Sequence, residues 1–206
     1  MHILCLDLEG VLIPEIWIGV AERTGIDALR LTTRDVPDYD ELMQGRLALL
    51  DEHGLGIDDI QAVIAELEPL SGARDFLDWA RSHLQVAILS DTYYEFARPL
   101  MAQLGWPLLL CHRLSIDDDG RVVDYHIRQP DPKRAAVRAF HELRYRVVAA
   151  GDSFNDTSML EEADAGIFFR APRNVVEHFP QFEATETYDE LRTRIEEAVY
   201  RFDHRP

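Results

Sequence analysis

Three short apolar runs, each ending in a polar cluster that contains aspartate, constrain the fold of this chain more than any other feature. Residues 2–6, 85–89 and 146–150 are almost continuously apolar, as expected of strands buried on both faces of a parallel sheet. The clusters that follow them are Asp7-Leu8-Glu9-Gly10, Ser90-Asp91-Thr92 and Gly151-Asp152-Ser153. Because ligands bind beyond the carboxyl ends of parallel strands, the three clusters are predicted to meet in one site.

Helical patterns alternate with these strands. Apolar residues at positions 73, 76, 77 and 80, and again at 96, 100 and 104, recur at helical spacing. Further strands are expected at 108–111 and 165–169, and alternating apolar residues around an Asp-Gly turn predict a hairpin at 115–127. This alternation predicts an α/β fold with a Rossmann-like parallel sheet core.

The segment between the first two strands is far longer than a single crossover helix requires. Its apolar residues recur at helical spacing in three stretches. We therefore expect a small helical cap at residues 14–70, inserted into a catalytic core formed by residues 1–13 and 71–206.

The net charge of −17 limits the partners of the chain. So acidic a surface repels nucleic acid phosphates and anionic membranes, and neither partner is expected. No apolar run approaches the ~20 residues of a membrane span and no signal-peptide pattern is visible, which favours a cytoplasmic location. Cys5 and Cys111 form no metal-binding pair, and the eight histidines show no ligand spacing and are interpreted as structural. An acidic protein with an anionic substrate needs a local positive site, and a metal ion is the expected source.

Carboxylates from two strands are expected to share that metal ion. Asp7 and Glu9 follow the first strand, and Asp152 and Asp156 follow the third. Carboxylates that meet at one rim repel each other unless a hard cation lies between them, and oxygen ligands suit Mg²⁺. An acidic pair after a strand is more often a turn or a helix cap, so it is the combination of the two clusters that favours a metal site.

Lys133 is the only lysine in the chain, whereas arginine occurs 20 times. A lysine ammonium is a compact charge that suits the neutralisation of phosphate or carboxylate. An exposed turn would also explain a lysine in Asp-Pro-Lys-Arg. Its place before a helix and the third strand favours the functional interpretation.

In order and spacing, these segments resemble the four motifs of the haloacid dehalogenase superfamily of aspartyl-phosphate phosphatases. The matching segments are DLEGVL at 7–12, ILSDT at 88–92, DPK at 131–133 and GDSFND at 151–156. The helical insertion resembles the cap of phosphoserine phosphatases, and DLEG and SDTYYEF are similar to the branch that also transfers phosphoryl groups from phosphoserine to homoserine. The resemblance implies a Mg²⁺-dependent phosphoserine phosphatase of serine and threonine biosynthesis.

The resemblance also implies a role for each residue of the site. Asp7 would be the nucleophile that forms an acyl phosphate, Glu9 the acid and base, and Lys133 a neutralising charge. The implied metal ligands are Asp7, the Glu9 carbonyl oxygen and Asp152, with Asp156 as a ligand or a neighbour of one. The implied substrate contacts are Ser90, Asp91 and Asn155 near the phosphate, and Glu15 and Arg46 of the cap at the amino and carboxylate groups.

Two residues depart from the pattern of the family. Glu9 stands where the family usually has Asp, and Asp91 stands where phosphoserine phosphatases usually have Gly. Both are expected to select the acceptor or to slow hydrolysis. Two other functions stay open, a phosphatase for another small phosphate ester and a receiver-like phosphoacceptor domain. The long insertion after the first strand argues against the receiver.

Overall fold

A seven-stranded sheet lies at the centre of the computed structural model, which describes residues 1–32, 35–36 and 38–204. The strand order is β4-β3-β2-β1-β5-β6-β7, and every neighbouring pair is parallel except β3 and β4. The strands are β1 (His2–Leu6), β2 (Gln85–Tyr93), β3 (Leu108–Ile116), β4 (Val122–His126), β5 (Arg146–Gly151), β6 (Ala165–Phe169) and β7 (Glu183–Thr185). The predicted α/β fold with a Rossmann-like parallel core is confirmed.

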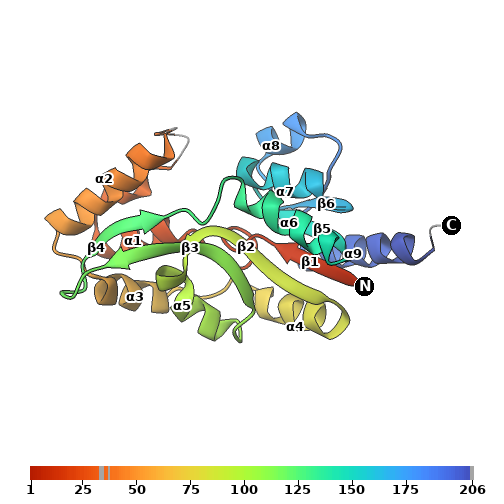
Figure 1. The fold of residues 1–206 in the computed structure, drawn as a ribbon, viewed down its shortest axis with the longest axis horizontal. Helices are drawn as coiled ribbons and strands as arrows, with labels where there is room; N and C mark the ends of the chain where they lie inside the picture. Colours follow the sequence, from red (N-terminus) through yellow and green to blue (C-terminus); the bar gives the residue numbers. More distant parts are fainter. Residues whose placement is uncertain (33–34, 37, 205–206) are drawn as a thin grey trace.

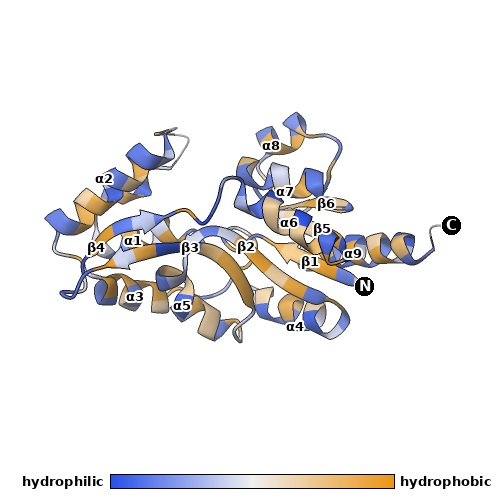
Figure 2. Cartoon of the chain, viewed as in Figure 1, coloured by the Kyte–Doolittle hydropathy of each residue, from blue (hydrophilic) through white to orange (hydrophobic). Residues whose placement is uncertain are grey.

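Helices cover both faces of the sheet (Figure 1). The helices α4 (Ala73–His83), α5 (Tyr94–Gln103) and α9 (Tyr188–Asp203) pack on one face, and α6 (Pro132–Glu142), α7 (Thr157–Glu162) and α8 (Arg173–His178) pack on the other. In β1, Leu4 and Leu6 face the first group of helices, while Ile3 and Cys5 face the second. Figure 2 shows the resulting pattern, with hydrophobic strands at the centre and hydrophilic residues on the outward helix faces.

Two strands are longer than their apolar runs predict. The second strand continues from residue 89 through the polar cluster to Tyr93, because Tyr93 pairs with His112 after an irregularity in the register. The third joins the predicted strand at 108–111 to the first arm of the predicted hairpin, and β4 is the second arm. The short strand β7 was not predicted, since its sequence EAT carries no apolar run.

The segment between β1 and α4 is helical, as the sequence predicts. It contains α1 (Ile16–Thr24), the 3-10 turn η1 (Asp27–Arg30), α2 (Tyr39–Glu52) and α3 (Ile57–Ala65). In Figure 1 these helices lie at the left of the view together with the β3–β4 hairpin, and both termini lie at the right. The Tyr39 hydroxyl is 2.8 Å from the Tyr93 hydroxyl, and the Tyr125 hydroxyl donates to Asp40. Helix α2 is therefore attached both to the end of β2 and to the hairpin.

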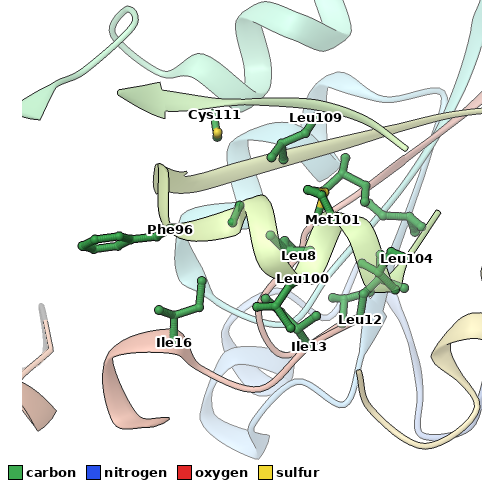
Figure 3. Close-up of a cluster of buried hydrophobic side chains, with 14 of the residues drawn as sticks. Leu8, Leu12, Ile13, Ile16, Phe96, Leu100, Met101, Leu104, Leu109 and Cys111 are labelled. Carbon is green, nitrogen blue, oxygen red and sulfur yellow. The ribbon is translucent and has the colours of Figure 1, made fainter. Parts of the chain in front are cut away.

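Buried apolar side chains fix the loop that follows β1. Figure 3 shows residues of this loop and of the start of α1 packed against α5 and β3. The labelled side chains are Leu8, Leu12, Ile13, Ile16, Phe96, Leu100, Met101, Leu104, Leu109 and Cys111. The loop that starts at Asp7 thus has a rigid base, as a precise site requires.

Cys5 and Cys111 are buried free thiols, and burial raises the pKa of both. None of the helices in the part of the chain that the structure describes is both long enough and apolar enough to cross a bilayer.

Candidate active site

The three polar clusters converge at the carboxyl ends of neighbouring strands. Asp7 follows β1, the central strand, which pairs in parallel with β2 on one side and β5 on the other. Asp91 lies near the end of β2, and Asp152 directly follows β5. Parallel strands bring these residues to the same edge of the sheet, although they are far apart in the sequence. The predicted single site is therefore present in the geometry.

Lys133 lies in the middle of this cluster, at the first turn of α6. Its Nζ is 2.8 Å from Asp7 Oδ1, 2.7 Å from Asp156 Oδ1 and 3.5 Å from Asp91 Oδ2. The lysine is 2% exposed. The exposed-turn interpretation of Lys133 is thus excluded, because the ammonium is buried among three carboxylates.

Asp156 organises the loop after β5. One of its oxygens pairs with Lys133, and the other accepts hydrogen bonds from the backbone N–H groups of Asp152 and Ser153. A Cβ on Gly151 would lie 2.4 Å from the Asp156 carboxyl carbon, so this close approach requires glycine. Asp156 thereby fixes the backbone that carries Asp152.

Gly10 allows a second close approach, between the β1 and β5 loops. Its φ is +75°, and a Cβ at this position would lie 2.2 Å from Asp152 Oδ2. Only glycine adopts this conformation without cost and leaves the space for the carboxylate. The next residue of the loop, Val11, accepts a hydrogen bond of 2.6 Å from the hydroxyl of Tyr188 at the start of α9.

The carboxylates of the site could hold a metal ion. Oxygens of Asp7, Asp152 and Asp156 lie within 4.8 Å of one another. Burial, with the Asp156 charge as the next cause, raises the pKa of Asp7 well above its usual value and that of Asp152 to about 7. The pKa of Lys133 is also raised, because Asp156 and Asp7 outweigh the effect of burial. One ammonium does not balance this negative charge, and an all-oxygen donor set suits Mg²⁺, so the residues fit the ion that the sequence predicts.

Glu9 connects the loop after β1 to the inserted helical segment. Its Oε2 accepts a hydrogen bond of 2.9 Å from the backbone N–H of Ile16, the first residue of α1. Burial, followed by the charge of Glu15, raises the pKa of Glu9 to about 8. Glu9 is thus a carboxyl group that holds its proton near neutral pH in this arrangement.

Glu15 and Arg46, the two cap residues predicted to select the substrate, both lie near Glu9. Glu15 is exposed at the N-terminus of α1, and its charge contributes to the raised pKa values of Glu9 and Asp152. Arg46 is buried in α2, with its guanidinium 4.5 Å from the centre of the Trp17 ring. One guanidinium nitrogen donates to the Leu31 carbonyl oxygen, and Nε is buried with no hydrogen-bond partner among the described residues.

Asp91 joins several parts of the site. Its Oδ2 accepts a hydrogen bond of 2.7 Å from Asn155 Nδ2, and its Oδ1 lies 3.7 Å from Nε2 of His112. Although burial alone would raise the pKa of Asp91, Lys133 and His112 hold that pKa well below its usual range. Asp91 is therefore ionised in this arrangement. Ser90 is buried beside it and accepts from the Thr92 backbone N–H.

Two features of the site have no clear signal in the sequence. His112 was grouped with the structural histidines, yet it lies next to Asp91. The pair of Tyr39 and Tyr93 was not singled out at all. In both cases the partner comes from another element: the register between β2 and β3 brings His112 beside Asp91, and Tyr39 of α2 meets Tyr93 at the end of β2.

A family model, haloacid dehalogenase-like hydrolase, matches residues 1–164. The chain therefore belongs to the haloacid dehalogenase-like hydrolase family, and the resemblance drawn from the four motifs is confirmed. The chain is 64% identical to phosphoserine phosphatase ThrH of Pseudomonas aeruginosa. The alignment spans 201 residues and covers 98% of both chains. The chain is 63% identical to a phosphoserine phosphatase of Pseudomonas syringae pv. tomato, covering 98% of this chain and 85% of that protein.

Solved structures of phosphoserine phosphatases share the fold. One, described as a phospho-aspartyl intermediate analogue, superposes with a TM-score of 0.76 at 18% identity and covers 94% of this chain and 98% of the other. A substrate-bound complex superposes with the same TM-score at 19% identity, covering 95% and 97%. At these identities the likeness is one of fold alone.

Proposed function

We propose that this chain is a Mg²⁺-dependent phosphoserine phosphatase that acts through an aspartyl-phosphate at Asp7 and also transfers the phosphoryl group to homoserine. The observation that carries the proposal is the contact of 2.8 Å between Lys133 and Asp7, at the strand edge where Asp152 and Asp156 converge. The high identity to two phosphoserine phosphatases over nearly the whole chain supports the substrate.

In the first step Asp7 attacks phosphorus. Because Lys133 holds Oδ1, we assign the attack to Oδ2. The bond from phosphorus to the serine oxygen breaks, and an acyl phosphate forms on Asp7. Lys133, the Ser90 hydroxyl and backbone N–H groups near Gly10 and Asp91 bind the phosphoryl oxygens. Mg²⁺ bound by Asp7, Asp152 and the Glu9 carbonyl oxygen would supply further neutralising charge.

Glu9 moves the proton in both steps. Its carboxyl group gives a proton to the leaving serine oxygen, and the resulting carboxylate then takes a proton from the attacking hydroxyl. That attack breaks the bond between Asp7 and phosphorus. Water as the acceptor yields inorganic phosphate, and homoserine yields phosphohomoserine. The link from Glu9 to the first residue of α1 supports this role, since it places the acid at the junction of cap and core.

Glu15 and Arg46 are proposed to bind the ammonium and the carboxylate of the substrate, respectively. Glu15 precedes α1 as its N-cap and Arg46 lies in α2, and both interact electrostatically with Glu9, so they are close to the proposed leaving group. The Nε of Arg46, which has no hydrogen-bond partner in the part of the chain that the structure describes, is a donor from which a carboxylate could accept. Asn155 is assigned to the same rim through its contact with Asp91. Residues 14–70 would then form the cap domain, and residues 1–13 with 71–206 the core.

The proposed transfer to homoserine uses the same site that binds the serine part of the substrate. A cap that excludes water and has just released serine can offer the vacated site to another amino acid. Homoserine has one methylene more than serine, and Glu9 has one more than the aspartate that usually stands at this position. The cytoplasmic location expected from the sequence is part of this proposal and stays a prediction.

Two alternative functions were a receiver-like phosphoacceptor domain and a phosphatase for another small ester. Membership of a hydrolase family argues against the receiver-like domain. A phosphatase for a different small ester would have no use for a carboxylate and a guanidinium that bind the ammonium and carboxylate groups of an amino acid. The positions of Glu15 and Arg46 near Glu9 therefore favour an amino-acid substrate over a sugar phosphate.

The test is phosphate release from a panel of small phosphomonoesters with Mg²⁺ or with excess chelator. We expect phosphoserine to be the preferred substrate, no turnover in chelator and no turnover in Asp7→Asn. In a parallel tube, phosphohomoserine should form from phosphoserine and homoserine. Full activity of Asp7→Asn would exclude the mechanism, and release of free phosphate alone at saturating homoserine would exclude the transfer.

A further inference from the structure

His112 uses both of its ring nitrogens, although it is almost completely buried. It is 3% exposed in β3. Nδ1 accepts a hydrogen bond of 3.2 Å from the backbone N–H of Arg128. In a neutral imidazole the proton then resides on Nε2. That nitrogen faces Asp91 Oδ1 at 3.7 Å, which is an electrostatic contact rather than a hydrogen bond.

Both partners of His112 are connected to Lys133, Asp91 through space and Arg128 along the chain. Asp91 approaches the ammonium directly, with its Oδ2 3.5 Å from Nζ. Arg128 belongs to the short connection between β4 and α6, and Lys133 is the second residue of α6. The imidazole thus contacts both the Asp91 side chain, which lies beside the ammonium, and the backbone of the β4–α6 connection, which precedes Lys133. No other described histidine forms two contacts of this kind around the site.

The position of the imidazole ring is itself well fixed. His112 is paired with Tyr93 across the β2–β3 register, and the two rings lie 6.1 Å apart. Tyr93 in turn meets the hydroxyl of Tyr39 from α2. Because the ring is held by several neighbours, it can fix the positions of the groups that it contacts. Residues that orient a reactive side chain must be rigid in this way.

We propose that His112 is a positioning residue for Lys133: it holds Asp91 and the β4–α6 connection so that the ammonium stays between Asp7 and Asp156. The inference deepens the proposed function, because it takes Lys133 to neutralise the transferred phosphoryl group. A small displacement of that charge costs rate, since catalysis depends on the geometry at the reacting atoms. His112 does not touch the substrate.

Two conservative variants separate the two contacts. In His112→Asn the amide can still accept from Arg128, but the contact with Asp91 is lost. In His112→Gln the longer amide can still present an N–H group to Asp91, but the acceptor for Arg128 is lost. We expect each to lower kcat about tenfold or more while KM for the phosphomonoester changes by less than about threefold. A merely structural role would lower the thermal midpoint and leave the kcat of the folded fraction unchanged.

The matched control is His141→Gln. His141 is half-buried, and its Nε2 also contacts an aspartate, at 3.0 Å from Asp164, but it lies at the opposite end of α6 from Lys133. This variant should keep wild-type kcat.

A second readout does not depend on activity. Because Lys133 is the only lysine of the chain, growth on lysine labelled with ¹³C at Cε gives one side-chain NMR signal. That signal should move in His112→Asn, in His112→Gln and in Asp91→Asn, and should stay in place in His141→Gln. An unmoved signal in both His112 variants would overturn the proposal, whatever happens to kcat. A moved signal with unchanged kcat would overturn it as well.

The outcomes are separable from those of the proposed function. The kinetic arm uses phosphoserine and, independently, p-nitrophenyl phosphate. If the wild type hydrolyses only the aryl ester, phosphoserine is the wrong substrate, yet the His112 variants still test the positioning role. If the wild type hydrolyses neither, the proposed function fails, and the NMR arm alone decides whether His112 sets the environment of Lys133.

Discussion

Replacing Lys133 by methionine should destabilise the protein far more than an ordinary ion-pair deletion. The substitution nearly keeps the shape of the side chain but removes the ammonium that lies 2.8 Å from Asp7 and 2.7 Å from Asp156. These carboxylates are 5% and 0% exposed, so solvent cannot replace the lost charge. Leaving a buried charge without its partner costs about 3 to 5 kcal/mol. At about 2 to 4 °C per kcal/mol for a chain of this size, the thermal midpoint should fall by about 6 to 20 °C.

The assay is thermal unfolding by circular dichroism in chelator, so that no metal ion compensates for the missing ammonium. The neighbouring Arg134→Met is the matched control. Arg134 also forms ion pairs, with Asp131 and Glu161, but these groups are partly exposed, and such pairs contribute about 0 to 1 kcal/mol. Equal midpoints for the two variants, or a Lys133→Met protein as stable as the wild type, would refute the argument from buried charge.

The companion variant Lys133→Arg keeps the charge but not the shape. A planar guanidinium does not fit where a compact ammonium lies between two buried carboxylates, so we expect most of the turnover to be lost. Wild-type turnover in this variant would show that the site needs only a positive charge of any shape.

Three further predictions concern substrate selection, the close approach of two loops and the metal ion. Arg46→Ala should raise KM for phosphoserine about tenfold or more and leave p-nitrophenyl phosphate hydrolysis nearly unchanged; equal effects on both substrates would show that Arg46 is not the selector. Gly10→Ala should lower kcat roughly a hundredfold, because its Cβ would collide with Asp152. Gly25→Ala is the control, since Gly25 has a similar φ of +72° and the described residues place nothing within 4 Å of the added Cβ. Mg²⁺ at about 100 times its dissociation constant should stabilise the wild type by about 2.7 kcal/mol in thermal unfolding, and Asp152→Asn should show less than half of the resulting midpoint shift; identical shifts would remove Asp152 from the metal site.

The central part of the fold could be predicted because it depends on local apolar runs. Residues 2–6 and 165–169 form strands within the predicted limits, since a strand buried on both faces must be apolar throughout. The extension of β2 to Tyr93 could not be read in the same way. It is stabilised by pairing with β3, and such pairing leaves no trace in the local sequence of β2.

The same contrast holds within the site. The convergence of Asp7 and Asp152 follows from the rule that parallel strands end at one edge, and the importance of Lys133 followed from its being a single lysine. The contact between His112 and Asp91 depends instead on the register between two strands. A shift of one residue would turn His112 to the other face of the sheet.

The hydrogen bond from Tyr188 to Val11 has a consequence for the order in which the molecule is assembled. During synthesis β1 emerges before its partners β2 and β5, and the backbone N–H of Asp7 bonds to the Ala150 carbonyl oxygen of β5. A nascent chain that ends before Tyr188 already carries all four motifs, yet its first loop lacks the hydroxyl that holds it. Asp7, the proposed nucleophile, is therefore made well before the contacts that set it in place.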